Sequence, residues 1–212
     1  MSAEKEKELE WYLNDIAANE EMLGKDNLEI AVEYARIALA YNELERYEEA
    51  LEWYLKVLAI IEKTRGKEDL VTALTYRGLA EIYSDMCRPD MALEWCFKAL
   101  LIYENKRDED SFGLAATYNA IGTNYWYKDE NEEALEWFYK ALPIYEEALG
   151  TDSIDIFDFY TMLALTSFAA GKDDEGKMWS NKGFVIYKKE MGETDSLEIN
   201  SADDIKKALG YV

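Results

Sequence analysis

The residues that most often perform catalysis are scarce in this chain. None of its 212 residues is histidine, the side chain that most often serves as a general base or a metal ligand. The two cysteines, Cys87 and Cys96, therefore lack a histidine that could activate a thiolate. We expect Cys96 to be a buried packing residue. Cys87 is expected to lie at an exposed helix–helix turn, with a redox role as the minor alternative.

Carboxylates, by contrast, are abundant. The chain has 45 Asp and Glu against 23 Lys and Arg, a formal net charge of -22. A field of this sign repels phosphate backbones and anionic lipids, so nucleic acid and membrane are excluded as partners. The acidic run that begins at Asp108 lacks the ligand spacing of a calcium loop. We expect no metal site, no cofactor and no catalytic residues, and hence a protein that is not an enzyme.

The composition favours a soluble, all-helical protein. The sequence has no apolar run of the roughly 18 residues that a membrane-spanning helix needs, and its first residues lack the apolar core of a signal peptide. Two prolines and eleven glycines are few, whereas Ala, Leu, Glu and Lys are frequent. These features predict a cytoplasmic chain in which 49% hydrophobic residues are enough to form a sizeable core.

The tryptophans reveal an internal repeat. Five of the six tryptophans follow one another at intervals of 42 residues: Trp11, Trp53, Trp95, Trp137 and Trp179. Trp126 alone falls outside this spacing. The segments around the middle three read EEALEW, DMALEW and EEALEW. Because flanking residues recur together with the tryptophan, the chain is built from copies of one unit.

Each unit is predicted to be a pair of antiparallel helices. Apolar residues recur at intervals of three and four, as at Leu51, Tyr54 and Leu58, which places them on one helix face. Small residues recur where the two helices cross, which allows the axes to approach to about 8 Å. The first helices carry Tyr34, Tyr76, Tyr118 and Tyr160, and then Ala38, Ala80, Gly122 and Ala164. One unit cannot cover its own apolar face, so the units must stack as a solenoid.

This series of large, small and aromatic positions resembles the tetratricopeptide repeat from about residue 5 to 195. The 42-residue period and acidic links such as that at 149–152 are similar to the kinesin-light-chain variety. The resemblance implies an all-α, right-handed superhelix of about four full repeats in a single domain, 1–212. The expected segments are an N-terminal capping half repeat at 5–22, repeats at 28–69, 70–111, 112–153 and 154–195, and a C-terminal capping helix at 201–209.

Features at the ends and within one helix add further predictions. Glu8 and Asp15 stand where the small residues of a half repeat would lie, which predicts a solvated cap at the native start of the chain. Ser201 with Asp204 predicts a capping box, and Gly210 a helix stop. Pro143 predicts a kink, an early end or fraying of its helix.

Without catalytic residues, function is expected to reside in a surface. The first helices of the pairs line the concave side of a solenoid, and the resemblance implies that this groove takes an extended or helical peptide of a partner protein. The candidate groove residues are Asn42, Arg77, Glu81, Asp85, Asn119, Thr123, Trp126, Tyr127, Thr161 and Phe168. Trp126 is the leading anchor because it breaks the repeat spacing and lies beside Tyr127. The alternative is that Trp126 packs against the next repeat near Phe168.

Two partner classes follow. The acidity predicts steering of a basic peptide toward Glu43, Glu81 and Asp85. The Lys/Arg cluster with which chaperone-binding family members clamp a C-terminal carboxylate is missing from the predicted groove, which disfavours that ligand. The second hypothesis is a self-associating, homo-oligomeric module in which the C-terminal repeat, softened by Gly176 and Gly183, stacks on another chain.

Overall fold

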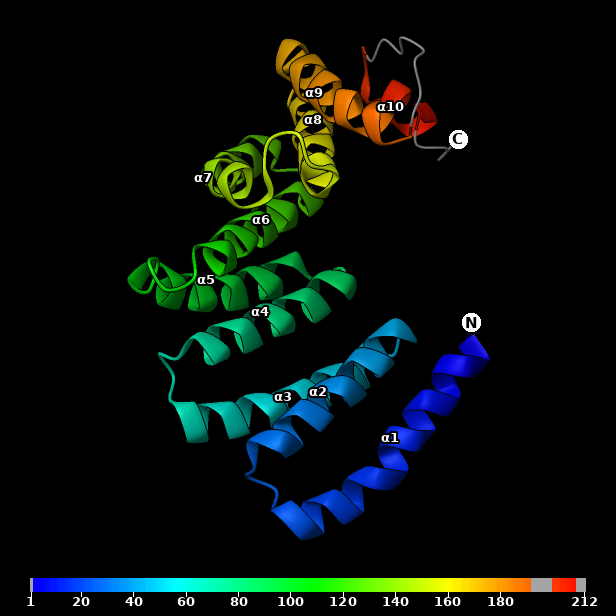
Figure 1. Ribbon diagram of the computed structural model, residues 1–212, viewed down its shortest axis with the longest axis vertical. Helices are drawn as coiled ribbons and strands as arrows, with labels where there is room; N and C mark the ends of the chain where they lie inside the picture. Colours follow the sequence, from blue (N-terminus) through cyan, green and yellow to red (C-terminus); the bar gives the residue numbers. More distant parts are fainter. Residues whose placement is uncertain (1, 192–199, 209–212) are drawn as a thin grey trace. The chain divides into compact units, whose positions relative to one another are not determined.

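The computed structural model describes residues 2–191 and 200–208, and within them every regular element is helical. The helices are α1 Ser2–Leu23, α2 Leu28–Glu43, α3 Tyr47–Arg65, α4 Leu70–Asp85, α5 Pro89–Asn105, α6 Ser111–Tyr127, α7 Asn131–Leu149, α8 Phe157–Ala169, α9 Asp173–Met191 and α10 Ala202–Ala208, with a 3₁₀ turn η1 at Ile154–Ile156 (Figure 1). None of the described helices is both long and apolar enough to cross a membrane. The prediction of an all-α fold is confirmed.

The chain divides into two compact units, Met1–Ala120 and Ile121–Val212, and the boundary falls within α6. In the first unit, α2 packs along α3 and α4 along α5, while α3 also contacts α4 and α1 contacts α2. In the second unit, α8 packs along α9, and α10 contacts α8. These consecutive helix pairs are the arrangement that the repeat predicts.

Side-chain caps fix where the first helix of each pair begins. Asn27 accepts a hydrogen bond from the backbone N–H of Glu29 at 2.8 Å, and Asp69 accepts one from Val71 at 2.9 Å. Asp110 and Ser153 accept equivalent bonds at the starts of α6 and η1. Each cap satisfies a backbone donor that the helix itself leaves unpaired.

The turns within the helix pairs share one left-handed backbone position. The residues at this position are Glu45, Cys87, Asp129 and Gly171, with φ of 59°, 55°, 62° and 72°. At each turn a backbone N–H reaches back five residues, as from Arg88 to the Tyr83 carbonyl at 2.9 Å. This bond closes the helix in a Schellman-type cap, which usually places glycine in the left-handed position. Three of the four turns have Glu45, Cys87 or Asp129 in place of glycine, and the Cβ of each of these residues makes the left-handed backbone strained.

Each unit has its own core at the helix crossings. In the first unit Ile37, Ala38 and Leu79 of the first helices are fully buried, and so are the small residues Ala50 and Ala92 of the second helices. In the second unit Tyr160, Leu163, Ala164, Ala134 and Ala141 are equally buried. The small side chains stand where the sequence places the closest approach of the helices.

A recurrent polar cluster accompanies the core. The hydroxyl of Tyr76 donates to Glu62 at 2.7 Å, and the ring of Tyr76 contacts that of Trp95, with 5.5 Å between centroids. The ammonium of Lys98 lies 3.7 Å from the centre of the Trp95 ring. Lys56 and Lys140 cover Trp53 and Trp137 in the same way, at 3.5 and 3.7 Å. Three tryptophans of the 42-residue series therefore share one environment.

The ends of the described chain agree with their sequence signals. In α1, Leu9 and Ile16 are buried whereas Glu8 and Asp15 are exposed, so the acids face solvent. Ser201 accepts a hydrogen bond from the backbone N–H of Asp204 at 3.3 Å, and the Asp204 carboxylate accepts one from the N–H of Asn200 at 3.0 Å. The first bond is the one that the predicted capping box requires, and the second comes from the residue before the cap. Gly210 lies outside the described residues.

The predicted early end at Pro143 is wrong. Helix α7 continues past Pro143 to Leu149. Pro143 is exposed, whereas the next two residues, Ile144 and Tyr145, are buried, and the Tyr145 ring lies 4.9 Å from that of Phe159. The burial of these two side chains offsets the backbone hydrogen bond that proline cannot donate.

Candidate functional site

The two compact units divide the ten predicted groove residues between them. Asn42, Arg77, Glu81, Asp85 and Asn119 belong to the first unit, and Thr123, Trp126, Tyr127, Thr161 and Phe168 to the second. Each set is therefore described within its own unit.

Asn42 and Asp85 bring the ends of α2 and α4 together. The Nδ2 of Asn42 donates to the Oδ2 of Asp85 at 2.8 Å, although the two residues lie 43 positions apart in sequence. The other amide atom of Asn42, Oδ1, is buried and has no hydrogen-bond partner among the described residues. An unsatisfied buried acceptor costs about 1–3 kcal/mol. A donor from a bound molecule would remove this cost.

Glu81 and Arg77 lie one turn apart on the same face of α4. Desolvation raises the pKa of the Glu81 carboxyl although part of its side chain reaches solvent. The neighbouring carboxylate of Asp85 raises this pKa further, while Arg77 lowers it. The two acids repel each other, so a cation placed beside them would gain more here than on an ordinary surface.

A small hollow, here called the Asn42 hollow, lies between these groups. Its lining residues are Ala38, Leu39, Asn42, Tyr54, Gly78, Glu81 and Ile82, and its volume is about 10 Å³. This volume is enough for about one water molecule or one small polar group. The hollow therefore combines an exposed apolar side chain, Leu39, with an acceptor and a carboxylate.

Tyr54 is a site residue that sequence reasoning missed. The sequence places it in the apolar stripe of its helix, but its hydroxyl end lies against Gly78, where a Cβ would come within 2.2 Å of the hydroxyl oxygen. Burial raises the pKa of Tyr54. Gly78 could have indicated this role in the sequence. Glycine within a helix costs about 1 kcal/mol relative to alanine, so its presence there indicates that a neighbouring side chain packs closely against the backbone.

The second unit holds the aromatic part of the predicted groove. Trp126 is half-buried and Tyr127 is 56% exposed, and their ring centroids lie 5.4 Å apart. Phe168 covers Gly176 of α9, so closely that a Cβ there would lie 2.7 Å from the ring. Phe168 is thus a packing residue between α8 and α9, and Tyr127 is the more accessible aromatic side chain. Thr123 and Thr161 are half-buried.

The cysteines occupy the environments that the sequence predicts. Cys96 is fully buried, and this burial raises the pKa of its thiol to about 12, so it remains protonated at neutral pH. Cys87 is exposed at its turn. Among the described residues, no group of three acidic or cysteine side chains is arranged to hold a metal ion.

Comparison with known proteins identifies the family. A family model described as tetratricopeptide repeat matches residues 28–96 and 72–147, together more than half of the chain. The protein belongs to the tetratricopeptide repeat family. A search of curated proteins finds no match.

Solved structures share the fold at low sequence identity. Kinesin light chain nearly identical TPR-like repeats from Podosopora anserina are 19% identical with a TM-score of 0.73, and the match covers 89% of each chain. BtubC (BKLC) from P. vanneervenii is 21% identical with a TM-score of 0.69, covering 80% of this chain and 68% of that one. The Rap conjugation gene regulator of plasmid pLS20, solved in complex with the Phr* peptide, is 19% identical with a TM-score of 0.70, covering 99% and 58%.

Proposed function

We propose that the protein is a non-enzymatic interaction module that binds a basic peptide segment of a partner protein on the surface formed by α2 and α4. One observation carries the proposal: the Asn42 Oδ1 acceptor is buried, finds no donor in the part of the chain that the structure describes, and lies beside the acidic pair Glu81 and Asp85. A peptide N–H would satisfy Asn42, and a lysine ammonium would relieve the repulsion between the acids. The peptide complex of the Rap regulator supports the class of ligand.

The proposed contacts have distinct roles. Asn42 accepts a peptide N–H while Asp85 holds its amide in place. Glu81 attracts the cation, and exposed Leu39 offers an apolar contact beside it. Arg77 limits the negative potential on the face of α4. Asn119 is a further polar contact in this unit. Taken by itself, the second unit offers Thr123, Trp126, Tyr127 and Thr161 as further candidate contacts, with Tyr127 as the most exposed anchor, whereas Phe168 packs against Gly176.

A fluorescein-labelled, lysine-rich decapeptide tests this proposal by fluorescence anisotropy. We expect binding that weakens as salt rises from about 50 to about 300 mM, because the attraction is electrostatic. Asn42→Ala and the double variant Glu81→Gln/Asp85→Asn should each weaken binding at least about tenfold. The control Glu52→Gln/Glu94→Gln removes the same charge from two exposed positions on α3 and α5. Equal affinity of the groove and control variants would contradict the proposal.

Self-association is the second proposal, because an apolar strip on α9 remains exposed. Met178 and Val185 are 51% and 68% exposed and lie seven residues apart, hence on one face of the helix. A second copy of the chain covering this face would bury both. Sedimentation equilibrium of the wild type and of Met178→Glu/Val185→Glu tests the idea. A wild-type monomer at every concentration would eliminate it.

A further inference from the structure

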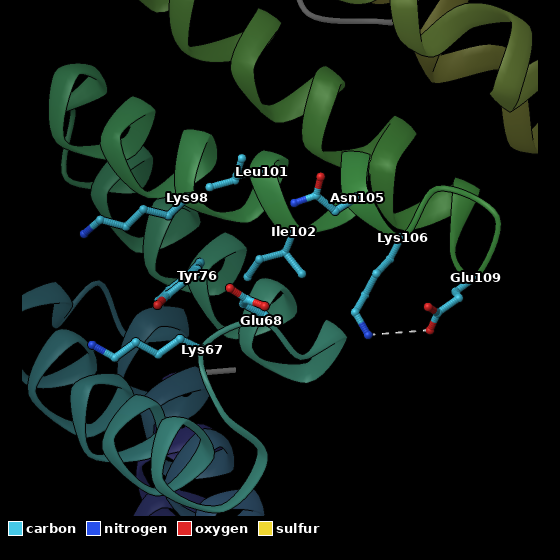
Figure 2. Close-up of a pocket in the computed structure, with 9 residues that line it drawn as sticks. All are labelled: Lys67, Glu68, Tyr76, Lys98, Leu101, Ile102, Asn105, Lys106 and Glu109. Carbon is cyan, nitrogen blue, oxygen red and sulfur yellow. Dashed lines mark ion pairs between the residues drawn. The ribbon is translucent and has the colours of Figure 1, made fainter.

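A second cavity lies at the edge of the first unit, where loops join successive helix pairs. Its volume is about 520 Å³, within the range of about 300–1,000 Å³ that is usual for small-molecule sites. We call it the edge pocket. Its lining residues are Lys67, Glu68, Tyr76, Lys98, Leu101, Ile102, Asn105, Lys106 and Glu109 (Figure 2). It shares no lining residue with the Asn42 hollow.

The edge pocket concentrates cations in a strongly acidic chain. Figure 2 shows the Lys67 and Lys98 side chains reaching from separate elements to the two sides of Tyr76. Lys67 lies 3.8 Å from Glu62 and is 75% exposed, and Lys98 covers the Trp95 ring. An exposed ion pair such as that of Lys67, and an exposed cation–π contact such as that of Lys98, each contribute little to stability. Both ammonium groups can therefore turn to an anion at small cost.

The floor of the edge pocket is apolar. Leu101 is 64% exposed although Ile102, the next residue of α5, is buried. In Figure 2 these two side chains, the Tyr76 ring and Glu68 lie between Lys67 and Lys98 at one end and the Lys106–Glu109 pair at the other. A ligand that fits this arrangement has one anionic group and one apolar group.

The preceding repeat carries different residues at the same edge. Forty-two residues earlier, Lys63 and Asp26 occupy the positions of Asn105 and Glu68, and they form an ion pair across the same edge. Alanine at position 59 stands where Leu101 provides the apolar floor. Asn105 carries no charge and therefore cannot form the ion pair that Lys63 makes with Asp26. Leu101 adds an apolar side chain at the same edge.

We propose that the edge pocket binds a small amphiphilic carboxylate, with the carboxylate between Lys67 and Lys98 and the alkyl or aryl group on Leu101. Glu68 and Glu109 also line the pocket, and they repel a doubly charged phosphate more strongly than a single negative charge, which selects a monoanion. This site is independent of the proposed peptide surface, since it uses different residues and a ligand of opposite charge.

Titration of the ¹⁵N-labelled protein with sodium octanoate, followed by NMR, tests the proposal. We expect saturable shifts of the backbone amides of Leu101 and Asn105, and none of comparable size with the neutral alcohol octanol. The double variant Lys67→Gln/Lys98→Gln should weaken octanoate binding at least about tenfold. The control Lys25→Gln/Lys56→Gln removes the equivalent lysines one repeat earlier and should bind as the wild type does. Equal affinities of the two double variants would overturn the proposal.

A second variant tests the apolar floor without disturbing the core. Leu101→Glu places a carboxylate on an exposed position of α5 and should abolish octanoate binding. Ala59→Glu is its control, because Ala59 occupies the equivalent position one repeat earlier and is also exposed. Equal binding of octanol and octanoate by the wild type, or octanoate shifts confined to residues outside the edge pocket, would also refute the proposal.

Discussion

The hydroxyl of Tyr160 donates a hydrogen bond to the Oε1 of Glu146 at 2.8 Å, from the first helix of one repeat to the second helix of the repeat before it. The same bond, always across 14 residues, joins Tyr34 to Glu20, Tyr76 to Glu62 and Tyr118 to Glu104. Burying tyrosine at a repeat junction requires a partner for its hydroxyl, and the glutamate supplies it. The Tyr–Glu hydrogen bond therefore recurs in each repeat, as the tryptophan does.

Removing one of these hydroxyls should destabilise the fold without creating a cavity. Tyr76→Phe leaves Glu62 without its donor, and we expect a loss of about 1–2 kcal/mol in the free energy of unfolding. Urea denaturation measures it. Tyr83→Phe, in the same helix but outside the Tyr–Glu series, is the control. Equal losses for the two variants would show that the bond contributes nothing specific.

Acid should weaken the junction between α1 and α2. The hydrogen bond from Tyr34 holds the pKa of Glu20 below its usual value. A lowered folded-state pKa gives stability that is present above the unfolded pKa, about 4.5, and is lost as pH falls through the folded value. Wild type should therefore exceed Tyr34→Phe in stability at pH about 6, and the difference should shrink toward pH about 3. A difference independent of pH would contradict this linkage.

The left-handed turns predict stabilising substitutions. Asp129→Gly and Glu45→Gly remove a side chain from a backbone with positive φ, and each should raise the free energy of unfolding by about 0.5–1 kcal/mol. Gly171→Ala adds a side chain at the equivalent left-handed position and should lower the free energy of unfolding. Thermal and urea melts of the three variants decide the matter. If Asp129→Gly and Glu45→Gly both lowered the free energy of unfolding, the native side chains would contribute more to the turns than the backbone strain costs.

Two glycines of α9 should respond oppositely to alanine. A Cβ at Gly183 would find its nearest neighbour, in Phe157, at an ordinary contact distance of 3.4 Å, whereas one at Gly176 would collide with the Phe168 ring at 2.7 Å. Gly183→Ala should stabilise by about 1 kcal/mol through helix propensity, and Gly176→Ala should destabilise. Denaturant midpoints compare the two. Stabilisation by both substitutions would show that Phe168 moves aside freely.

The aromatic pair of the second unit gives a functional prediction. Tyr127→Ala removes an exposed ring from the candidate surface of the second unit itself and should weaken binding of the lysine-rich peptide there, while leaving the melting temperature unchanged. Trp126→Ala should weaken binding too, with some loss of stability because Trp126 is half-buried. Anisotropy and thermal melts separate the two effects. Unchanged affinity in both variants would remove these residues from the site.

The repeat made the fold predictable, because residues that recur every 42 positions, such as Trp53 and Trp95, must occupy equivalent places. The same spacing at Glu62 and Glu104 could have revealed the Tyr–Glu bonds, but acids at helix ends look like ordinary surface charge. The Asn42–Asp85 bond joins residues 43 apart and lies outside any column of the repeat. A bond between non-equivalent positions depends on the packing of two helices, which no single-sequence pattern records.

The edge pocket was hidden from the sequence for a related reason. Asn105, which lines it, stands where the preceding repeat has a lysine, and a substitution in one copy of a repeat looks like ordinary divergence. Pro143 shows the converse error. Its local helix-breaking tendency is plain in the sequence, but the burial of Ile144 and Tyr145 that outweighs it depends on tertiary packing.

NMR titration of the ¹⁵N-labelled protein with the lysine-rich decapeptide locates the peptide on the protein. Binding on α2 and α4 should shift the side-chain amide of Asn42 and the backbone amides of Gly78 and Glu81 together, and the three shifts should saturate at one affinity. Shifts absent from all three, or centred instead on the edge pocket, would contradict the assignment of the peptide to the surface of α2 and α4.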